Sequence, residues 1–268
     1  MPRSVIGQSF RDLQKPALIC GAILALYSFL ALAFYPVLTA YPDFAAWLQS
    51  MVNAFQRMAG IAEPVATPAG FLNTAFLALV LPAALAAFSI LAIDRVFNRE
   101  REGGMFDILL AQPLPRWRLG LHKFGAVALS SAIVAILLWA IFAWRTTALG
   151  MAINLLRLAE VMVCAALVGL CFGGLTMILG ALTGHARLSR ALAWVGLVFA
   201  YLFFLTPQLA PGLKFIHLLS PFWYFFDANP LSNGVNLLHA AVLVLLTALT
   251  LIAALAIFEK ADLMEAGD

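Results

Sequence analysis

The chain of 268 residues is 64% hydrophobic and only 11% charged, and its mean hydropathy is +0.98. A soluble domain carries about 25% charged residues, so this composition excludes an ordinary soluble protein and indicates an integral membrane protein. The net charge of +3 is small and the charges lie at the ends of apolar runs, a distribution that argues against nucleic acid as a partner.

Six apolar runs are long enough to cross a bilayer as α-helices, which takes about 20 residues each. The runs are Ala17–Ala40, Phe71–Ile93, Phe124–Trp144, Leu155–Leu182, Ala191–Leu209 and Val235–Phe258. The first run exceeds the apolar region of about 7–15 residues in a cleaved signal peptide, so we expect it to be retained as a span. The predicted fold is an all-α integral membrane protein with six transmembrane helices in a single domain, residues 1–268.

The positions of lysine and arginine predict that both termini are cytoplasmic, because cytoplasmic loops carry an excess of these residues. With the N-terminus inside, twelve basic residues fall on the cytoplasmic side and four fall outside. The cytoplasmic set is Arg3, Arg11, Lys15, Arg95, Arg99, Arg101, Arg116, Arg118, Lys123, Arg187, Arg190 and Lys260, and the outer set is Arg57, Arg145, Arg157 and Lys214.

The segments on either side of the first run are predicted to be amphipathic helices. In residues 1–16, apolar positions recur at helical spacing, which predicts an interfacial helix that turns into the membrane at Pro16. In the outer loop, residues 41–69, the segment Phe44–Met58 has an apolar face and a polar face that includes Gln56. The sequence leaves open whether this apolar face lies on lipid or on the rest of the protein.

The loop between the second and third spans, residues 95–123, combines charged and apolar residues. Arg99–Glu102 carries charges of both signs, and the glycine pair that follows interrupts any helix continuing from the second span. The next stretch, "MFDILLAQ", predicts a helix of two turns with Asp107 near its start, where a carboxylate suits the helix dipole. A solvated loop has no need of the apolar residues in this stretch, so we interpret it as a cytoplasmic docking element.

The fourth span contains two patterns. Arg157 and Glu160 lie three residues apart, a spacing that predicts an ion pair on one helical face. This pair is either a substrate or proton site or a self-neutralised pair near the membrane surface. Gly169 and Gly173 lie four residues apart, a spacing that permits close helix packing, either within the chain or against a second copy.

The outer segment between the last two spans, residues 207–234, contains four prolines that exclude a continuous helix. Its apolar pieces are too short to span a bilayer. We therefore predict a re-entrant or interfacial element on the outer face.

Catalytic and nucleotide-binding motifs are absent from the sequence. There is no GxxxxGK[ST] loop for phosphate binding, and no HExxH, CxxC or GxSxG motif. Cys20, Cys164 and Cys171 lie in apolar runs and are expected to be small buried residues, with no metal site.

The loop sequence "EREGGMFDILLAQPLPRWRLGLHK" resembles the E-x-x-G-T-L-D-L-L-L-x-x-P-x-x-R-x-x-x-x-x-K stretch of ABC-2-type permease subunits. The matching residues are Glu100 or Glu102, Gly104, Asp107, Leu109, Leu110, Pro113, Arg116 and Lys123. Met105 stands where the family has Thr, which removes a hydroxyl suited to capping the helix. The similarity continues in "LGALTGHARLSRAL", "LSPFWYFFDANPLSNGV" and "FEKADL" and so covers nearly the whole chain.

The resemblance implies the permease subunit of an ATP-driven exporter in the bacterial plasma membrane. It implies two ABC ATPase subunits that hold ATP and Mg, with no cofactor on this chain, and a second permease that is either an identical copy or a paralogue. The cargo is expected to be lipid-like, amphipathic or a peptide. The residues expected to contact the ATPase are Glu100, Glu102, Gly103, Gly104, Met105, Phe106, Asp107, Ile108, Leu109 and Gln112.

Two functions of other classes are alternatives. A self-sufficient secondary transporter would require repeats and ionisable residues at mid-membrane, and the two halves of this chain show no evident likeness. An intramembrane enzyme acting on lipid would have to use Arg157, Glu160 or His239, which form no recognisable triad in the sequence. Recovery of an ATPase with the purified protein would support the exporter alone.

Overall fold

The structure is a computed structural model that describes residues 5–103, 116–209, 211–226 and 229–265. Its regular elements are all helices, and no strand occurs in these ranges. Six helical stretches are long and apolar enough to cross a membrane, which confirms the six predicted spans. They are Gly7–Ala40, Pro68–Glu102, Trp117–Ala148, Leu155–Thr183, Ala186–Pro207 and Leu237–Lys260.

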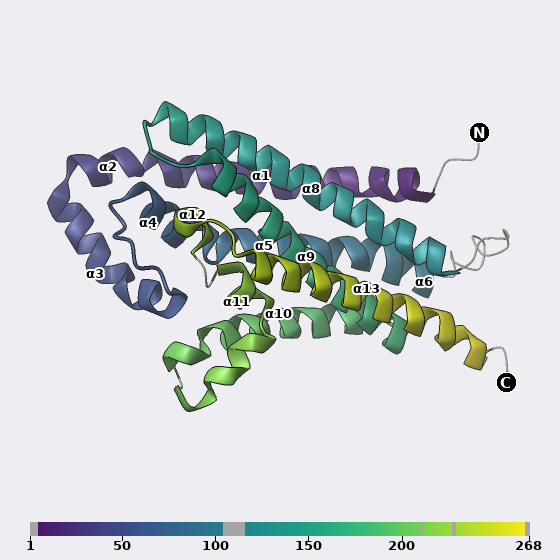
Figure 1. Ribbon diagram of the computed structural model, residues 1–268. Helices are drawn as coiled ribbons and strands as arrows, with labels where there is room; N and C mark the ends of the chain where they lie inside the picture. The colour runs from purple at the N-terminus through teal and green to yellow at the C-terminus, as the bar shows by residue number, and fades with distance from the viewer. Residues whose placement is uncertain (1–4, 104–115, 210, 227–228, 266–268) are drawn as a thin grey trace.

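The long helices form one bundle (Figure 1). They are α1 (Val5–Ala33), α5 (Val80–Ile93), α8 (Arg116–Ala148), α9 (Leu155–Thr183), α10 (Ala186–Leu209) and α13 (Leu237–Glu265). Within an apolar 18-residue stretch of each span, 67% of the residues are buried in the spans of α5 and α9, whereas the share is 22%, 28% and 22% in those of α1, α10 and α13. The centre of the bundle is therefore the α5–α9 pair, and α1, α10 and α13 turn most of their surface outward.

The second span is assembled from five pieces. The helix α4 (Pro68–Leu72) leads into a π-helix, η1 (Asn73–Leu77), and α5 leads into a second π-helix, η2 (Asp94–Asn98), and then into α6 (Arg99–Glu102). The start of α1, the end of α13 and the exit of α6 lie at one end of the bundle, which we call the inner end (Figure 1). The opposite end, with α2 (Tyr35–Ala40), α3 (Pro42–Ala59) and α12 (Pro230–Asn233), is the outer end.

The turn predicted at Pro16 is wrong, because α1 continues through this residue as one helix. Leu13 is completely buried and packs in the same cluster as Val96 and Phe97. This packing holds the first turns of α1 against the bundle and offsets the one backbone hydrogen bond that proline removes.

The predicted amphipathic helix of the outer loop is confirmed as α3, and its apolar face divides between two environments. Trp47 and Met51 are exposed, whereas Val52 and Phe55 pack on the protein core. Gln56, expected on the polar outer face, is instead buried, and its amide donates to the Thr74 hydroxyl at 2.7 Å. Polar residues of α3 therefore hold the helix on the bundle.

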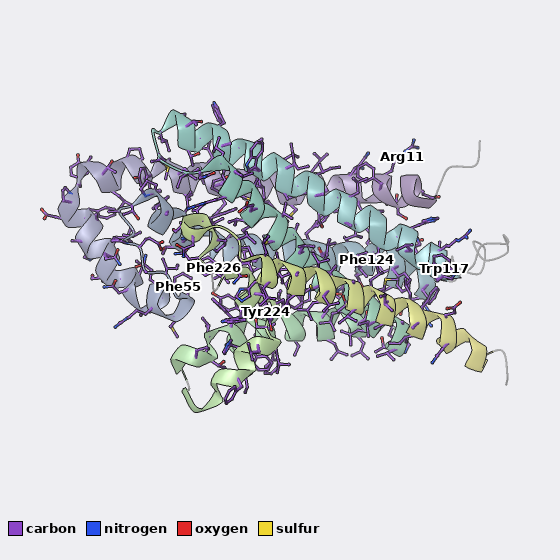
Figure 2. All side chains as sticks on the ribbon, in the orientation of Figure 1. Arg11, Phe55, Trp117, Phe124, Tyr224 and Phe226 are labelled. Carbon is purple, nitrogen blue, oxygen red and sulfur yellow. The ribbon has the colours of Figure 1, made fainter. Side chains whose placement is uncertain are left out.

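The outer segment after α10 contains η3 (Pro211–Leu219), α11 (Pro221–Phe226) and α12. Each of these short helices begins at a proline, as expected for a segment that cannot form one continuous helix. Figure 2 shows Tyr224 and Phe226 of α11 beside the bundle, away from Trp117 at the inner end. The Ser220 hydroxyl donates to the Ala200 carbonyl of α10 at 2.6 Å and fixes the segment to that helix.

The glycines of α9 pack within the chain. A Cβ atom at Gly169 would lie 2.8 Å from the Leu85 carbonyl oxygen of α5, and a Cβ at Gly174 would lie 2.7 Å from the Thr250 Cβ of α13. The close approach that the glycine spacing predicted therefore joins α9 to α5 and α13.

Gly169→Ala is expected to destabilise the protein by about 1–3 kcal/mol, because the new methyl group meets backbone atoms that move only with the whole of α5. Gly173→Ala is the matched control, since its Cβ would lie 3.4 Å from the Ser89 Cβ, an ordinary contact. Unfolding of the purified variants in one detergent measures the difference. Equal stability of the two variants would contradict the close α5–α9 contact.

The predicted orientation can be tested by labelling single cysteines in a variant without Cys20, Cys164 and Cys171. We expect Asn53→Cys on α3 to react with a membrane-impermeant thiol reagent in intact cells, and Arg187→Cys on α10 to react only after lysis. Both side chains are exposed, so accessibility within the protein does not limit either reaction. Labelling of position 187 but not of position 53 in intact cells would show that the topology is the reverse of the predicted one.

Candidate functional site

The strongest concentration of buried polar groups lies at the inner end, where the second span leaves the bundle through η2 and α6. The sequence predicted a docking element directly after this point. Asp94, Asn98, Glu100, Arg101 and Glu102 each contact another helix or pair with a charged side chain. We call these five residues the inner polar cluster.

Asp94 is the most buried charge of the cluster, with 1% of its side chain exposed. Its Oδ2 atom accepts from Arg99 Nε at 3.0 Å and from Arg190 Nη1 of α10 at 2.8 Å. Its Oδ1 atom is buried and has no hydrogen-bond partner among the described residues. One carboxylate oxygen thus joins α10 to the beginning of α6.

Asn98 lies one turn further along and is also buried. Its amide donates to the Ser189 hydroxyl of α10 at 2.9 Å and to the Thr176 carbonyl of α9 at 3.4 Å. Gly180 of α9 leaves room for this side chain, because a Cβ atom there would lie 1.8 Å from Asn98 Oδ1. The amide therefore occupies a space that only glycine leaves open.

The two charges at the end of α6 contact the turn between α9 and α10. Arg101 Nη1 donates to the carbonyls of Gly180 and Ala181 at 3.0 and 3.1 Å, in the last turn of α9. Glu102 Oε2 accepts from the backbone N–H of Ala186, the first residue of α10, at 3.3 Å. A cation at a helix C-terminus and an anion at a helix N-terminus both match the helix dipole.

Glu100 faces the other way, toward α8. Its carboxylate receives a hydrogen bond from Lys123 Nζ at 2.6 Å, and only 2% of the Lys123 side chain is exposed. This ion pair joins the helix before residues 104–115 to the helix after them. The helices on both sides of residues 104–115 are thereby attached to the bundle.

Only part of the predicted contact set can be placed. Glu100, Glu102 and Gly103 belong to the described residues, and the first two are engaged as above. The remaining predicted contacts, Gly104, Met105, Phe106, Asp107, Ile108, Leu109 and Gln112, lie outside the residues that the structure describes. Asp94 and Asn98 were not predicted as site residues, although a polar residue every fourth position at the end of an apolar run was a signal for them.

The ion pair predicted between Arg157 and Glu160 is wrong. Arg157 donates instead to the Ser232 carbonyl, and Glu160 Oε2 accepts from the Val235 N–H at 3.4 Å. Both side chains reach the backbone that leads into α13 and satisfy peptide groups there. Each of the two side chains therefore anchors the outer segment separately.

A second polar group at the outer end also escaped the sequence reasoning. Asn229 donates to both carboxylate oxygens of Glu63 at 2.7 Å and accepts from the fully buried Asn73 of η1 at 2.7 Å. Burial raises the pKa of Glu63, but polar neighbours, among them the Asn229 amide, outweigh it, so the net pKa lies below the ordinary value. The charged carboxylate thus fastens the loop before α4 to the outer segment.

The arrangement is suited to transmitting force between helices. Among the residues that the structure describes, no group of three or more His, Cys, Asp or Glu side chains could hold a metal ion. The charges of the inner polar cluster pair with Arg99, Arg190 and Lys123 or with helix ends. Fold and site together define a multi-pass helical membrane protein. At its inner end, hydrogen bonds and ion pairs join the second span to α8, α9 and α10.

Comparison with known families identifies the class further. The model of the ABC-2 family of transporter proteins matches residues 6–263, nearly the entire chain. The chain belongs to the ABC-2 transporter family and is a membrane component of a transporter. The comparison with curated proteins found no match.

Proposed function

We propose that this chain is the permease subunit of an ATP-driven exporter in the bacterial plasma membrane. The observation that carries the proposal is the attachment of α6 and α8, on either side of residues 104–115, to the rest of the bundle in a member of the ABC-2 family. If a partner moves residues 104–115, α6 and α8 can transmit this motion to α9 and α10.

The partner in this proposal is a separate ABC ATPase, present as two subunits that bind ATP and Mg. These 268 residues contain no phosphate-binding loop, which supports hydrolysis on another chain. Two permeases, identical or paralogous, would form the pathway between them, and this chain would bind no cofactor.

The proposed cargo is lipid-like, amphipathic or a peptide with apolar side chains. In support, a cavity of about 310 Å³ opens between α9, α10 and α13 and is lined mainly by apolar residues, among them Phe172, Phe199 and Leu246. Thr250 adds a polar group to this lining. Such a surface favours a hydrocarbon chain over a small ion.

Purification in a mild detergent tests the proposal directly. We expect an ATPase to co-purify in about equal amount with the permease and to remain through size-exclusion chromatography. A protein recovered without any ATPase, under conditions that keep it folded, would reject the exporter and favour a self-sufficient transporter or an enzyme.

A further inference from the structure

A row of three polar contacts joins the second span to the first turn of α10. Asp94 pairs with Arg190, Asn98 with Ser189, and Glu102 with the N–H of Ala186; the distances are 2.8, 2.9 and 3.3 Å. We call this row the polar seam.

The geometry of the polar seam is regular. Its three residues on the second span lie four positions apart, and its three on α10 stand at relative positions 0, 3 and 4. Both spacings place the contacting residues on one helical face. The seam includes η2, a π-helical turn, and such turns are frequent where a helix carries a function.

We propose that the polar seam makes α10 move together with α6 when the ATPase acts, with Asp94 and Arg190 as the positioning residues of this link. The inference rests on the proposed function, since it assigns a route for the motion that the ATPase would impose on residues 104–115. It adds that, of the two helices whose adjoining ends contact α6, α10 and not α9 is the one that follows it.

Burial supports α10 as the helix that moves. In the apolar 18-residue stretches of the α5 and α9 spans, 67% of the residues are buried in the bundle, whereas the share in the α10 span is 28%. Displacing α10 therefore breaks fewer packing contacts than displacing α9, although α6 contacts the ends of both helices. The seam supplies directional contacts where apolar packing is weak.

The far end of α10 leads to the outer segment. The Ala200 carbonyl accepts from Ser220, and the rings of Tyr201 and Phe204 lie 5.5 and 6.5 Å from those of Phe222 and Phe226 in α11. A shift of α10 at the inner end is thus transmitted to the outer segment without passing through the α5–α9 centre.

The experiment uses the permease–ATPase complex in nanodiscs of phosphatidylethanolamine and phosphatidylglycerol. In a background without native cysteines, Val195→Cys on α10 carries a spin label, and ATP with vanadate is the probe. Val195 is 50% exposed, so a label fits there, and Ile19→Cys on α1, 61% exposed, reports on a helix outside the seam. We expect vanadate trapping to change the mobility of the label at position 195 and to leave position 19 unchanged.

Arg190→Gln is the decisive variant. It should retain the ATPase and lose most of the vanadate-induced change at position 195, whereas Arg190→Lys should keep it because the charge opposite Asp94 remains. Arg187→Gln removes an exposed arginine from the same turn of α10 and serves as the matched control with a normal response. If Arg190→Gln lowers the yield of folded protein, Ser189→Ala replaces it, since it removes the hydroxyl that accepts from Asn98 at 2.9 Å, and the response should fall by at least half.

The outcomes separate the two proposals. Failure of the unmodified permease to retain any ATPase rejects the proposed function. Retention of the ATPase with no change at position 195, or with a full change in Arg190→Gln or in its substitute, overturns the role of the polar seam and leaves the exporter standing.

Discussion

A permease with both Phe106→Asp and Leu109→Asp is expected to reach the membrane in normal amount and to lose its ATPase on purification. The sequence predicts that these two apolar side chains lie on the cytoplasmic docking element and enter a groove of the ATPase. Burying a side chain of this size contributes about 1.5–3 kcal/mol, so each loss should weaken the complex by roughly 10- to 100-fold. Neither residue belongs to a predicted span, which is why insertion should be unaffected.

The measurement is the amount of ATPase recovered per permease at matched expression. Asp107→Ala should have a smaller effect, because a helix-dipole interaction at a surface is worth about 0.3–1 kcal/mol. The control is Trp47→Asp with Met51→Asp, two apolar residues of α3 that lie outside every span and are 54% and 63% exposed. Full recovery of the ATPase with the Phe106 and Leu109 variant would contradict the docking role and favour a solvated loop at residues 105–112.

The spans and the outer amphipathic helix could be predicted from the sequence because their signals are local. A run of about 20 apolar residues has one stable arrangement in a bilayer, a helix that satisfies its own backbone. The apolar stripe of Phe44–Met58 likewise fixes a helix, now observed as α3. The stripe does not determine which part of the protein or membrane each face of the helix contacts. The contact of the buried Gln56 with Thr74 was therefore not predicted.

The contacts of the candidate site are between residues far apart in the chain, and they were not predictable in the same way. Arg157 and Glu160 have the spacing of an ion pair, yet backbone groups of the outer segment compete successfully for both side chains. Asp94 ends an apolar run, where a charge ordinarily reaches the membrane surface. Its burial depends on Arg190, 96 positions away, and no local pattern contains that information.

The ion pair between Glu100 and Lys123 should be the most costly contact of the inner polar cluster to break from one side. Glu100→Gln is expected to lower the free energy of unfolding by about 3 kcal/mol, the lower end for a buried pair, because it leaves the Lys123 ammonium buried without its carboxylate. We expect the smallest value of the usual range for a buried ion pair because 25% of the Glu100 side chain is exposed to solvent.

Adding Lys123→Met to Glu100→Gln should recover much of this loss, because an apolar side chain of similar length can occupy the buried site without a charge. Unfolding of the purified proteins by SDS titration gives the free energies for a double-mutant cycle. Glu259→Gln is the matched control, an exposed carboxylate near the inner end of α13 that should leave stability unchanged. A double variant less stable than Glu100→Gln alone would show that Lys123 is held chiefly by contacts other than Glu100, and that the join between α6 and α8 does not depend on this pair.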